Sequence, residues 1–151
     1  MQRALRSEEM VMMPFWGLGK VTGVSHGFYH IRPLRLHHPI RIPESNLAEM
    51  GIRPILSEVE MSEIIFLQRI PQRAMRQGLS GGYNQWIELL RSGMPGVRPW
   101  ILRQMCRSTG PLGPRASELR AIIRQNFREE IQVVFGCSRR QAAAYARKAL
   151  G

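Results

Sequence analysis

The sequence contains no aspartate, only two lysines and only two cysteines. Without aspartate, acid–base or metal-assisted catalysis would depend on glutamate, histidine or cysteine, and these residues form no recognisable catalytic set along the chain. Cys106 and Cys137 have neither metal-site nor disulfide-framework spacing, which predicts reduced, partly buried thiols. The sequence therefore predicts neither an enzyme nor a bound cofactor, metal or small-molecule substrate.

Long apolar runs are also missing. No segment approaches the roughly 20 consecutive apolar residues that are needed to cross a bilayer. The apolar stretch at residues 10–18 is broken by Pro14 and Gly17, and it lacks the basic start and apolar core of a signal peptide. We expect a cytoplasmic protein without a membrane partner.

Positive charge is abundant and unevenly distributed. The 151 residues are 44% hydrophobic, as in globular proteins, and carry a formal net charge of +11. Residues 1–70 contain eight basic and seven acidic residues, whereas residues 71–151 contain fourteen basic and four acidic ones. A net +10 half beside a +1 half indicates a polyanionic partner for the second half, most often nucleic acid. Arginine, which dominates here, suits phosphate oxygens and guanine edges.

The first part of the chain shows the pattern of short strands. Between residues 10 and 42, the runs VMM, KVTGV, FYHI and PIRI are separated by glycine, proline and histidine turns. This pattern predicts a small twisted sheet or barrel.

The stretch IRIPESNLAEMGIR follows and has the pattern of a rigid joint. It begins as a strand with Ile40 and Ile42 on one face and Arg41 on the other. Pro43 ends the strand, and Gly51 suits the left-handed position that closes a helical turn. The sequence thus displays an arginine just before the joint.

After the joint the periodicity becomes helical. Ser57 and Glu60 form a capping-box pattern, which starts the first helix. Apolar residues at helical spacing predict helices at about 57–69, 83–92, 97–109, 117–135 and 138–150. We therefore expect an α+β protein whose residues 1–56 form the strand domain and whose residues 57–151 form a basic bundle of helices.

Arginines recur along the longest predicted helix. Arg120, Arg124 and Arg128 are four residues apart and lie opposite its apolar stripe, so they can follow a phosphate backbone. The same pattern also fits a solvated face that is partly neutralised by nearby glutamates, namely Glu118, Glu129 and Glu130. The basic surface is extended by Arg73 and Arg76, in a glycine-rich connector, and by Arg139 and Arg140, at the start of the last predicted helix.

The order and spacing of these motifs resemble the CarD/CdnL family, bacterial transcription regulators that bind RNA polymerase. MVMMPFWGLGKVTGV resembles the first hairpin of the family's Tudor-like barrel, which transcription-repair coupling factors share. IRIPESNLAEMGIR resembles the last barrel strand and the joint, and RSGMPGVRPWILRQM resembles the start of the helical module. The resemblance covers about residues 8–150.

The resemblance implies a fold, two partners and their contact residues. It implies a small N-terminal Tudor-like β-barrel that binds the RNA polymerase β subunit through Arg41 and its strand neighbours Ile40, Ile42 and Pro43. It also implies that the C-terminal bundle of helices contacts promoter double-stranded DNA and stabilises the open complex. Leu79 stands where some members place a tryptophan wedge, so the resemblance implies DNA contact there and through the arginines described above, Arg73, Arg76, Arg120, Arg124 and Arg128. The protein would then be associated with the nucleoid through RNA polymerase.

Two other classes of function remain open at the level of sequence. A stand-alone module could bind RNA or DNA through the barrel without polymerase contact, in which case residues 1–70 would bind nucleic acid despite their small net charge. An enzyme acting on nucleic acid could instead use His26, His30 and a glutamate to hold a metal ion.

Overall fold

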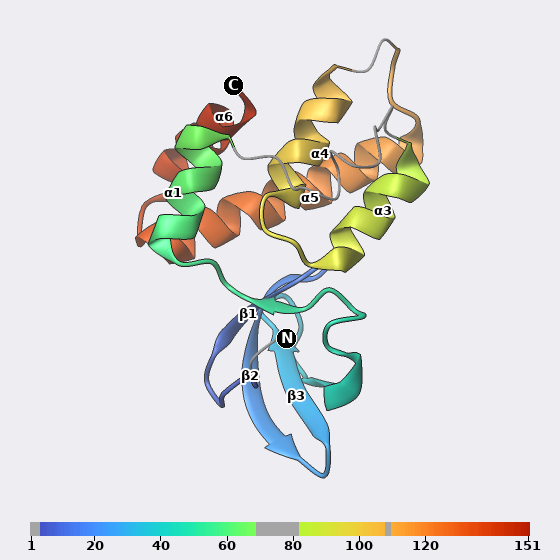
Figure 1. The fold of residues 1–151 in the computed structure, drawn as a ribbon, viewed down its shortest axis with the longest axis vertical. Helices are drawn as coiled ribbons and strands as arrows, with labels where there is room; N and C mark the ends of the chain where they lie inside the picture. Colours follow the sequence, from blue (N-terminus) through green and yellow to red (C-terminus); the bar gives the residue numbers. More distant parts are fainter. Residues whose placement is uncertain (1–3, 69–81, 108–109) are drawn as a thin grey trace.

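The computed structural model describes residues 4–68, 82–107 and 110–151. Strands come first in the chain and helices follow, so the predicted α+β class is confirmed. The sheet and the helices form two layers of the molecule, with the helices packed over one end of the sheet (Figure 1).

The sheet contains five antiparallel strands in the order β4-β3-β2-β1-β5. Their bounds are β1 Met10–Met13, β2 Gly17–Ser25, β3 Phe28–Pro33, β4 Ile40–Pro43 and β5 Arg53–Pro54. The first four correspond to the predicted strands. The fifth was not predicted, because two residues carry no alternation and form a strand only by pairing with β1.

The sheet is open, and this corrects the expectation of a closed barrel. Among the described residues, β4 and β5 lie at opposite edges and do not pair with each other. Closure needs continuous pairing around the ring, and β5 contributes only two residues to it. A register shift in β2 between Val21 and Gly23 adds a local bend to the sheet but does not close it.

Five α-helices follow a short 3-10 turn, η1 (Glu44–Asn46), in the described part of the chain. They are α1 (Glu58–Leu67), α3 (Tyr83–Ser92), α4 (Val97–Cys106), α5 (Pro114–Phe135) and α6 (Arg139–Leu150). Helix α5 begins earlier than predicted, because the fixed φ of Pro114 suits the first helical position. None of the described helices is long and apolar enough to cross a membrane.

Two clusters of buried apolar side chains divide the chain near the joint. One cluster belongs to the sheet and consists of Leu5, Val11, Met13, Val21, Tyr29, Ile31, Ile42, Leu47 and Ile52. The other belongs to the helices, runs from Leu56 to Ala149, and includes the two tryptophans that the sequence places in helical patterns, Trp86 and Trp100. Phe15, from the β1–β2 turn, packs against this second cluster, so it forms a contact between the sheet and the helices.

The joint between the clusters needs a glycine. Gly51 has a φ of +70°, and a Cβ added there would overlap the backbone carbonyl of Arg91 at the end of α3. The left-handed position predicted for Gly51 is therefore confirmed. The close approach of two backbones at this point fixes the end of the joint against α3.

Candidate protein and nucleic-acid interfaces

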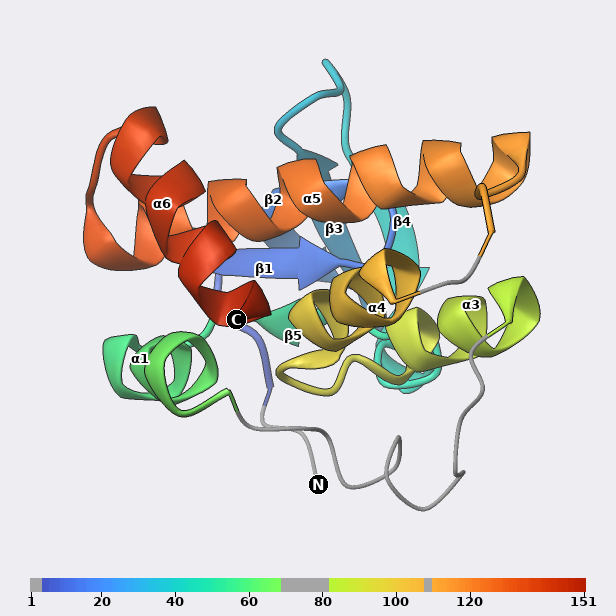
Figure 2. The same cartoon turned by 90° about the horizontal axis from the view of Figure 1, so that it is seen from above.

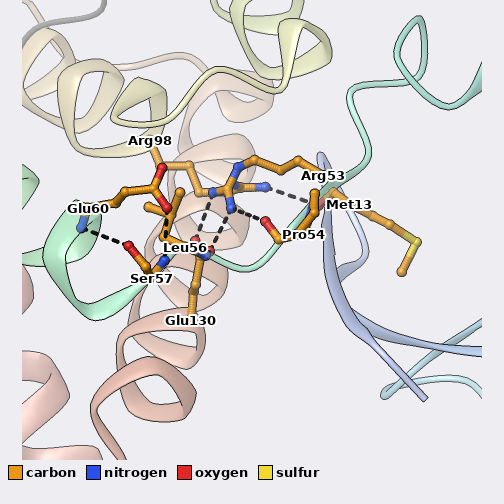
Figure 3. A network of polar contacts seen from close by, with 8 residues as sticks. All are labelled: Met13, Arg53, Pro54, Leu56, Ser57, Glu60, Arg98 and Glu130. Atoms are coloured by element: carbon orange, nitrogen blue, oxygen red, sulfur yellow. Dashed lines mark hydrogen bonds and ion pairs between the residues drawn. The ribbon is translucent and has the colours of Figure 1, made fainter. Parts of the chain in front are cut away.

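A buried ion pair connects the joint to the longest helix (Figure 3). Arg53 donates from Nη1 to Oε2 of Glu130 at 2.7 Å and from Nη2 to Oε1 at 2.9 Å. The backbone N–H of Leu56 donates to the same Oε2 at 3.0 Å, and Arg53 also donates to the carbonyl of Pro54. The Glu130 side chain is 1% exposed and that of Arg53 is 12% exposed. This buried, two-hydrogen-bond ion pair holds the joint against α5.

A second arginine strengthens this junction from α4. Arg98 is buried and donates from Nη2 to the carbonyl of Met13, the last residue of β1, at 3.0 Å. Burial and the nearby charge of Arg53 lower the pKa of Arg98 to about 10, although the negative charge of Glu130 partly offsets this by raising the pKa. The carboxylate therefore compensates two guanidinium groups, one from the joint and one from the helices.

Burial alone would raise the pKa of Glu130. The charge of Arg53 and its hydrogen bonds, the charge of Arg98 and the N–H of Leu56 outweigh that effect and hold the pKa below its ordinary value of 4.5. Glu130 is therefore ionised in the folded protein at neutral pH. The sequence left open that Glu130 helps to neutralise a solvated face of arginines; the structure corrects this for Glu130, which is buried and faces the junction.

A further contact joins the β3–β4 loop to α5. Arg35 donates from Nη2 to Oδ1 of Asn126 at 2.8 Å and to Oε2 of Glu129 at 3.0 Å. Asn126 is buried and donates from Nδ2 to the carbonyl of Phe15 at 3.2 Å. A Cβ at Gly17, whose φ is +76°, would overlap the Asn126 side chain. These contacts reach the sheet at a point different from the Arg53–Glu130 pair, so the junction resists rotation.

The outer face of the sheet presents the arginine that the sequence placed before the joint. Arg41 is exposed on β4, and its Cζ lies 4.3 Å from the ring centroid of Phe28 on β3. Its cross-strand partner is His30, whose Nε2 is 2.9 Å from the hydroxyl of Ser25. Stacking on Phe28 restricts the guanidinium, so Arg41 is presented in a defined position.

The other residues that the resemblance assigns to this face differ in accessibility. Ile42 is only 2% exposed and belongs to the sheet core, while Ile40 and Pro43 are half-buried. Arg41 is therefore the most accessible member of the set, and Ile42 supports the strand from behind.

Two of the three predicted arginines on α5 line a groove between α5 and α6. The groove has a volume of about 550 Å³, and α6 packs against α5 beside it (Figure 2). We call it the arginine groove, because its lining contains Arg124, Arg128, Arg139 and Arg140. Arg120 lies two turns closer to the start of α5 than Arg128 and is not part of this lining.

The remaining predicted DNA-contact residues, Arg73, Arg76 and Leu79, lie outside the described residues. Within the described ranges, no group of three or more histidine, cysteine, aspartate or glutamate side chains is placed to hold a metal ion. Cys106 is exposed rather than partly buried, and Cys137 is half-buried; both are free thiols.

No protein-family model matches the chain, and no curated protein sequence matches it. These comparisons assign no family, so function has to be argued from the interfaces themselves.

Sequence reasoning missed the residues that build the junction. Arg53 and Glu130 are 77 positions apart, and Arg35 and Asn126 are 91 apart. A polar residue next to the apolar stripe of a helix can indicate a buried side chain that needs a hydrogen-bond partner. On α5, Asn126 precedes Phe127 and Glu130 precedes Ile131, and both polar side chains are buried.

Proposed function

We propose that this protein is a non-enzymatic transcription regulator that bridges RNA polymerase and promoter DNA. The sheet would bind the polymerase β subunit through Arg41, and the basic helices would bind the duplex and stabilise the open complex. The two-part organisation carries this proposal: residues 1–70, which hold the sheet and α1 and carry a net charge of only +1, are fixed by a buried ion pair to residues 71–151, which carry a net charge of +10. A junction of this kind suits a protein that must set the angle between two large partners.

The assignment of partners draws on the resemblance to the CarD/CdnL family and on charge. The four-strand pattern, the joint and the helical module occur in the order that the family shows, and Arg41 occupies the matching position on the strand before the joint. An exposed basic side chain on an otherwise nearly neutral part fits a local acidic patch on a protein better than a long polyanion.

Contact with DNA draws on the helical part. Salt-dependent, sequence-independent attraction to phosphates requires basic side chains that are not already neutralised. The arginine groove provides such side chains, and Arg120 continues the series along α5.

The experiment that tests the proposal is retention of RNA polymerase, or of its isolated β-subunit lobe, on the immobilised full chain. Wild type and Arg41→Glu are compared with Arg107→Glu, a charge reversal at an exposed position after α4, far from Arg41 in the chain. We expect wild type and Arg107→Glu to retain polymerase and Arg41→Glu to lose it, with all three showing the same circular dichroism spectrum.

The opposite outcome has a definite meaning. If the wild-type protein retains no polymerase and still binds duplex DNA, the bridging function fails. A stand-alone nucleic-acid-binding module is then the better account, and the stacked Arg41–Phe28 pair becomes a candidate contact for a base.

A further inference from the structure

We propose that the arginine groove is a phosphate-binding site in which guanidinium groups from two helices surround a single phosphate group. The choice of a phosphodiester of duplex DNA as the occupant rests on the proposed function. The phosphate chemistry itself rests on the groove and would apply equally to a free polyphosphate.

The first argument is the absence of compensating charge. The groove lining contains four arginines and one glutamate, Glu129. Oε2 of Glu129 accepts from Arg35 at 3.0 Å, and Oε1 accepts from Gln125 at 3.1 Å, so the carboxylate is paired with an arginine that is not part of the groove lining. Within the part of the chain that the structure describes, none of the four arginines forms a salt bridge. The positive charge of the groove is therefore available to an external anion.

The second argument concerns Arg128, the most enclosed of the four. Its Nε is buried and has no hydrogen-bond partner among the described residues. Burial, followed by the charges of Arg124 and Arg147, lowers the pKa of Arg128, which means that its surroundings disfavour the positive charge. A bound phosphate would supply both the missing acceptor and the missing negative charge, and the planar guanidinium fork suits its oxygens.

The third argument is the shape of the groove. Its arginines come from two elements: Arg124 and Arg128 are one turn apart on α5, while Arg139 and Arg140 begin α6. The rest of the lining is three short side chains, Ala121, Ala142 and Ala143, and three polar ones, Gln125, Glu129 and Gln132. Short side chains leave room for an anion between long basic ones. The amino terminus of α6 lies beside the same space and adds partial positive charge.

The test uses the full chain and a pair of substitutions on the rim of the groove. Arg139→Gln/Arg140→Gln removes two exposed charges without touching the buried side of α6. Arg91→Gln/Arg107→Gln is the matched control, because it also removes two exposed charges from the helical part but lies outside the groove. Binding of a fluorescent duplex is measured by anisotropy across a range of salt concentrations.

A phosphate held in the groove would lower duplex affinity by about tenfold or more in the groove variant, since a hydrogen-bonded charge contact contributes roughly 1.5–3 kcal/mol. The slope of log affinity against log salt would become shallower by about 0.9, the loss of one phosphate contact. The control would change affinity by less than about threefold, because distant exposed charges are screened. If the wild type binds duplex, equal effects in the two variants, or no effect in either, would overturn the proposal.

A second arm separates this site from the proposed function. Inorganic pyrophosphate is titrated into the wild type and both variants, and the heat of binding is recorded. We expect binding by the wild type and the control and loss of binding in the groove variant; no heat from the wild type would overturn the site. If pyrophosphate binding behaves as expected while the wild type binds no duplex, the phosphate site stands, its occupant is a free polyphosphate, and the DNA-binding half of the proposed function fails.

Discussion

The junction and the arginine groove use the same residue type in opposite ways. At the junction, Arg53 is paired with the carboxylate of Glu130, and Arg35 is paired with that of Glu129. Arg98 donates to a backbone carbonyl and is also stabilised by the negative charge of Glu130. In the groove, four arginines share one glutamate whose oxygens are already used. Paired arginines fix the position of the sheet on the helices, and unpaired ones leave charge for a ligand.

This difference follows from desolvation. A buried guanidinium without a partner is costly, so arginines that cross between the sheet and α5 must be compensated within the protein. On the far side of α5 and at the start of α6, Arg124, Arg139 and Arg140 are exposed to water and need no partner within the protein, whereas the Nε of Arg128 is buried and lacks the acceptor that an anion would supply. Net charge alone would not separate the two sites, because Arg98 at the junction and the arginines of the groove all count toward the excess of +10 in residues 71–151.

The comparison is tested most strongly at two neighbouring glutamates. Glu130→Gln removes the carboxylate that compensates Arg53 and the buried Arg98, so we expect it to lower the free energy of unfolding by about 3–5 kcal/mol. Glu129→Gln loses a half-exposed pair with Arg35 and should cost about 1 kcal/mol or less. Chemical denaturation at neutral pH measures both.

Similar losses for the two variants would contradict the assignment of Glu130 to a buried junction. A large loss for Glu129→Gln alone would instead place the main connection at the β3–β4 loop.

A second comparison concerns the backbone at the joint. Gly51 and Gly27 both have positive φ values, +70° and +79°, but a Cβ at Gly27 meets nothing within 4 Å, whereas one at Gly51 overlaps the Arg91 carbonyl. Gly27→Ala should lower the free energy of unfolding by about 1–2 kcal/mol, because alanine is strained in the left-handed backbone conformation. Gly51→Ala adds a backbone displacement of α3, and we expect a loss larger by about 1–2 kcal/mol. Thermal or chemical unfolding of the two variants measures the difference, and equal losses would show that α3 does not fix the joint.

Local patterns in the sequence were sufficient to predict much of the fold. Alternation located β1 to β4, and the capping box predicted at Ser57 is present with reciprocal hydrogen bonds. These features depend on residues a few positions apart, which is the range over which periodicity and capping carry information.

The missing features depend on residues far apart. The two-residue β5 exists because Arg53 pairs with Met12 across the sheet, and whether the strands close into a barrel depends on edges that no local pattern specifies. For the same reason, Arg139 and Arg140 were recognised as basic, but their convergence with Arg124 and Arg128 depends on how α6 packs on α5. The sequence could therefore indicate which residues are basic, but it could not indicate which of them share a site.

A last comparison concerns the response of the junction to acid. Because the folded pKa of Glu130 lies below its ordinary value of 4.5, the stabilisation from this carboxylate is fully present above pH 4.5 and is lost as the pH falls through the folded pKa. The wild type should therefore lose more stability than Glu130→Gln when the pH is lowered from neutral to below 4.5, and the two unfolding curves should converge on acidification. Denaturation at a series of pH values measures this convergence. Parallel curves would mean that Glu130 has the same proton affinity in the folded and unfolded chains, which is incompatible with a carboxylate held between Arg53 and Arg98.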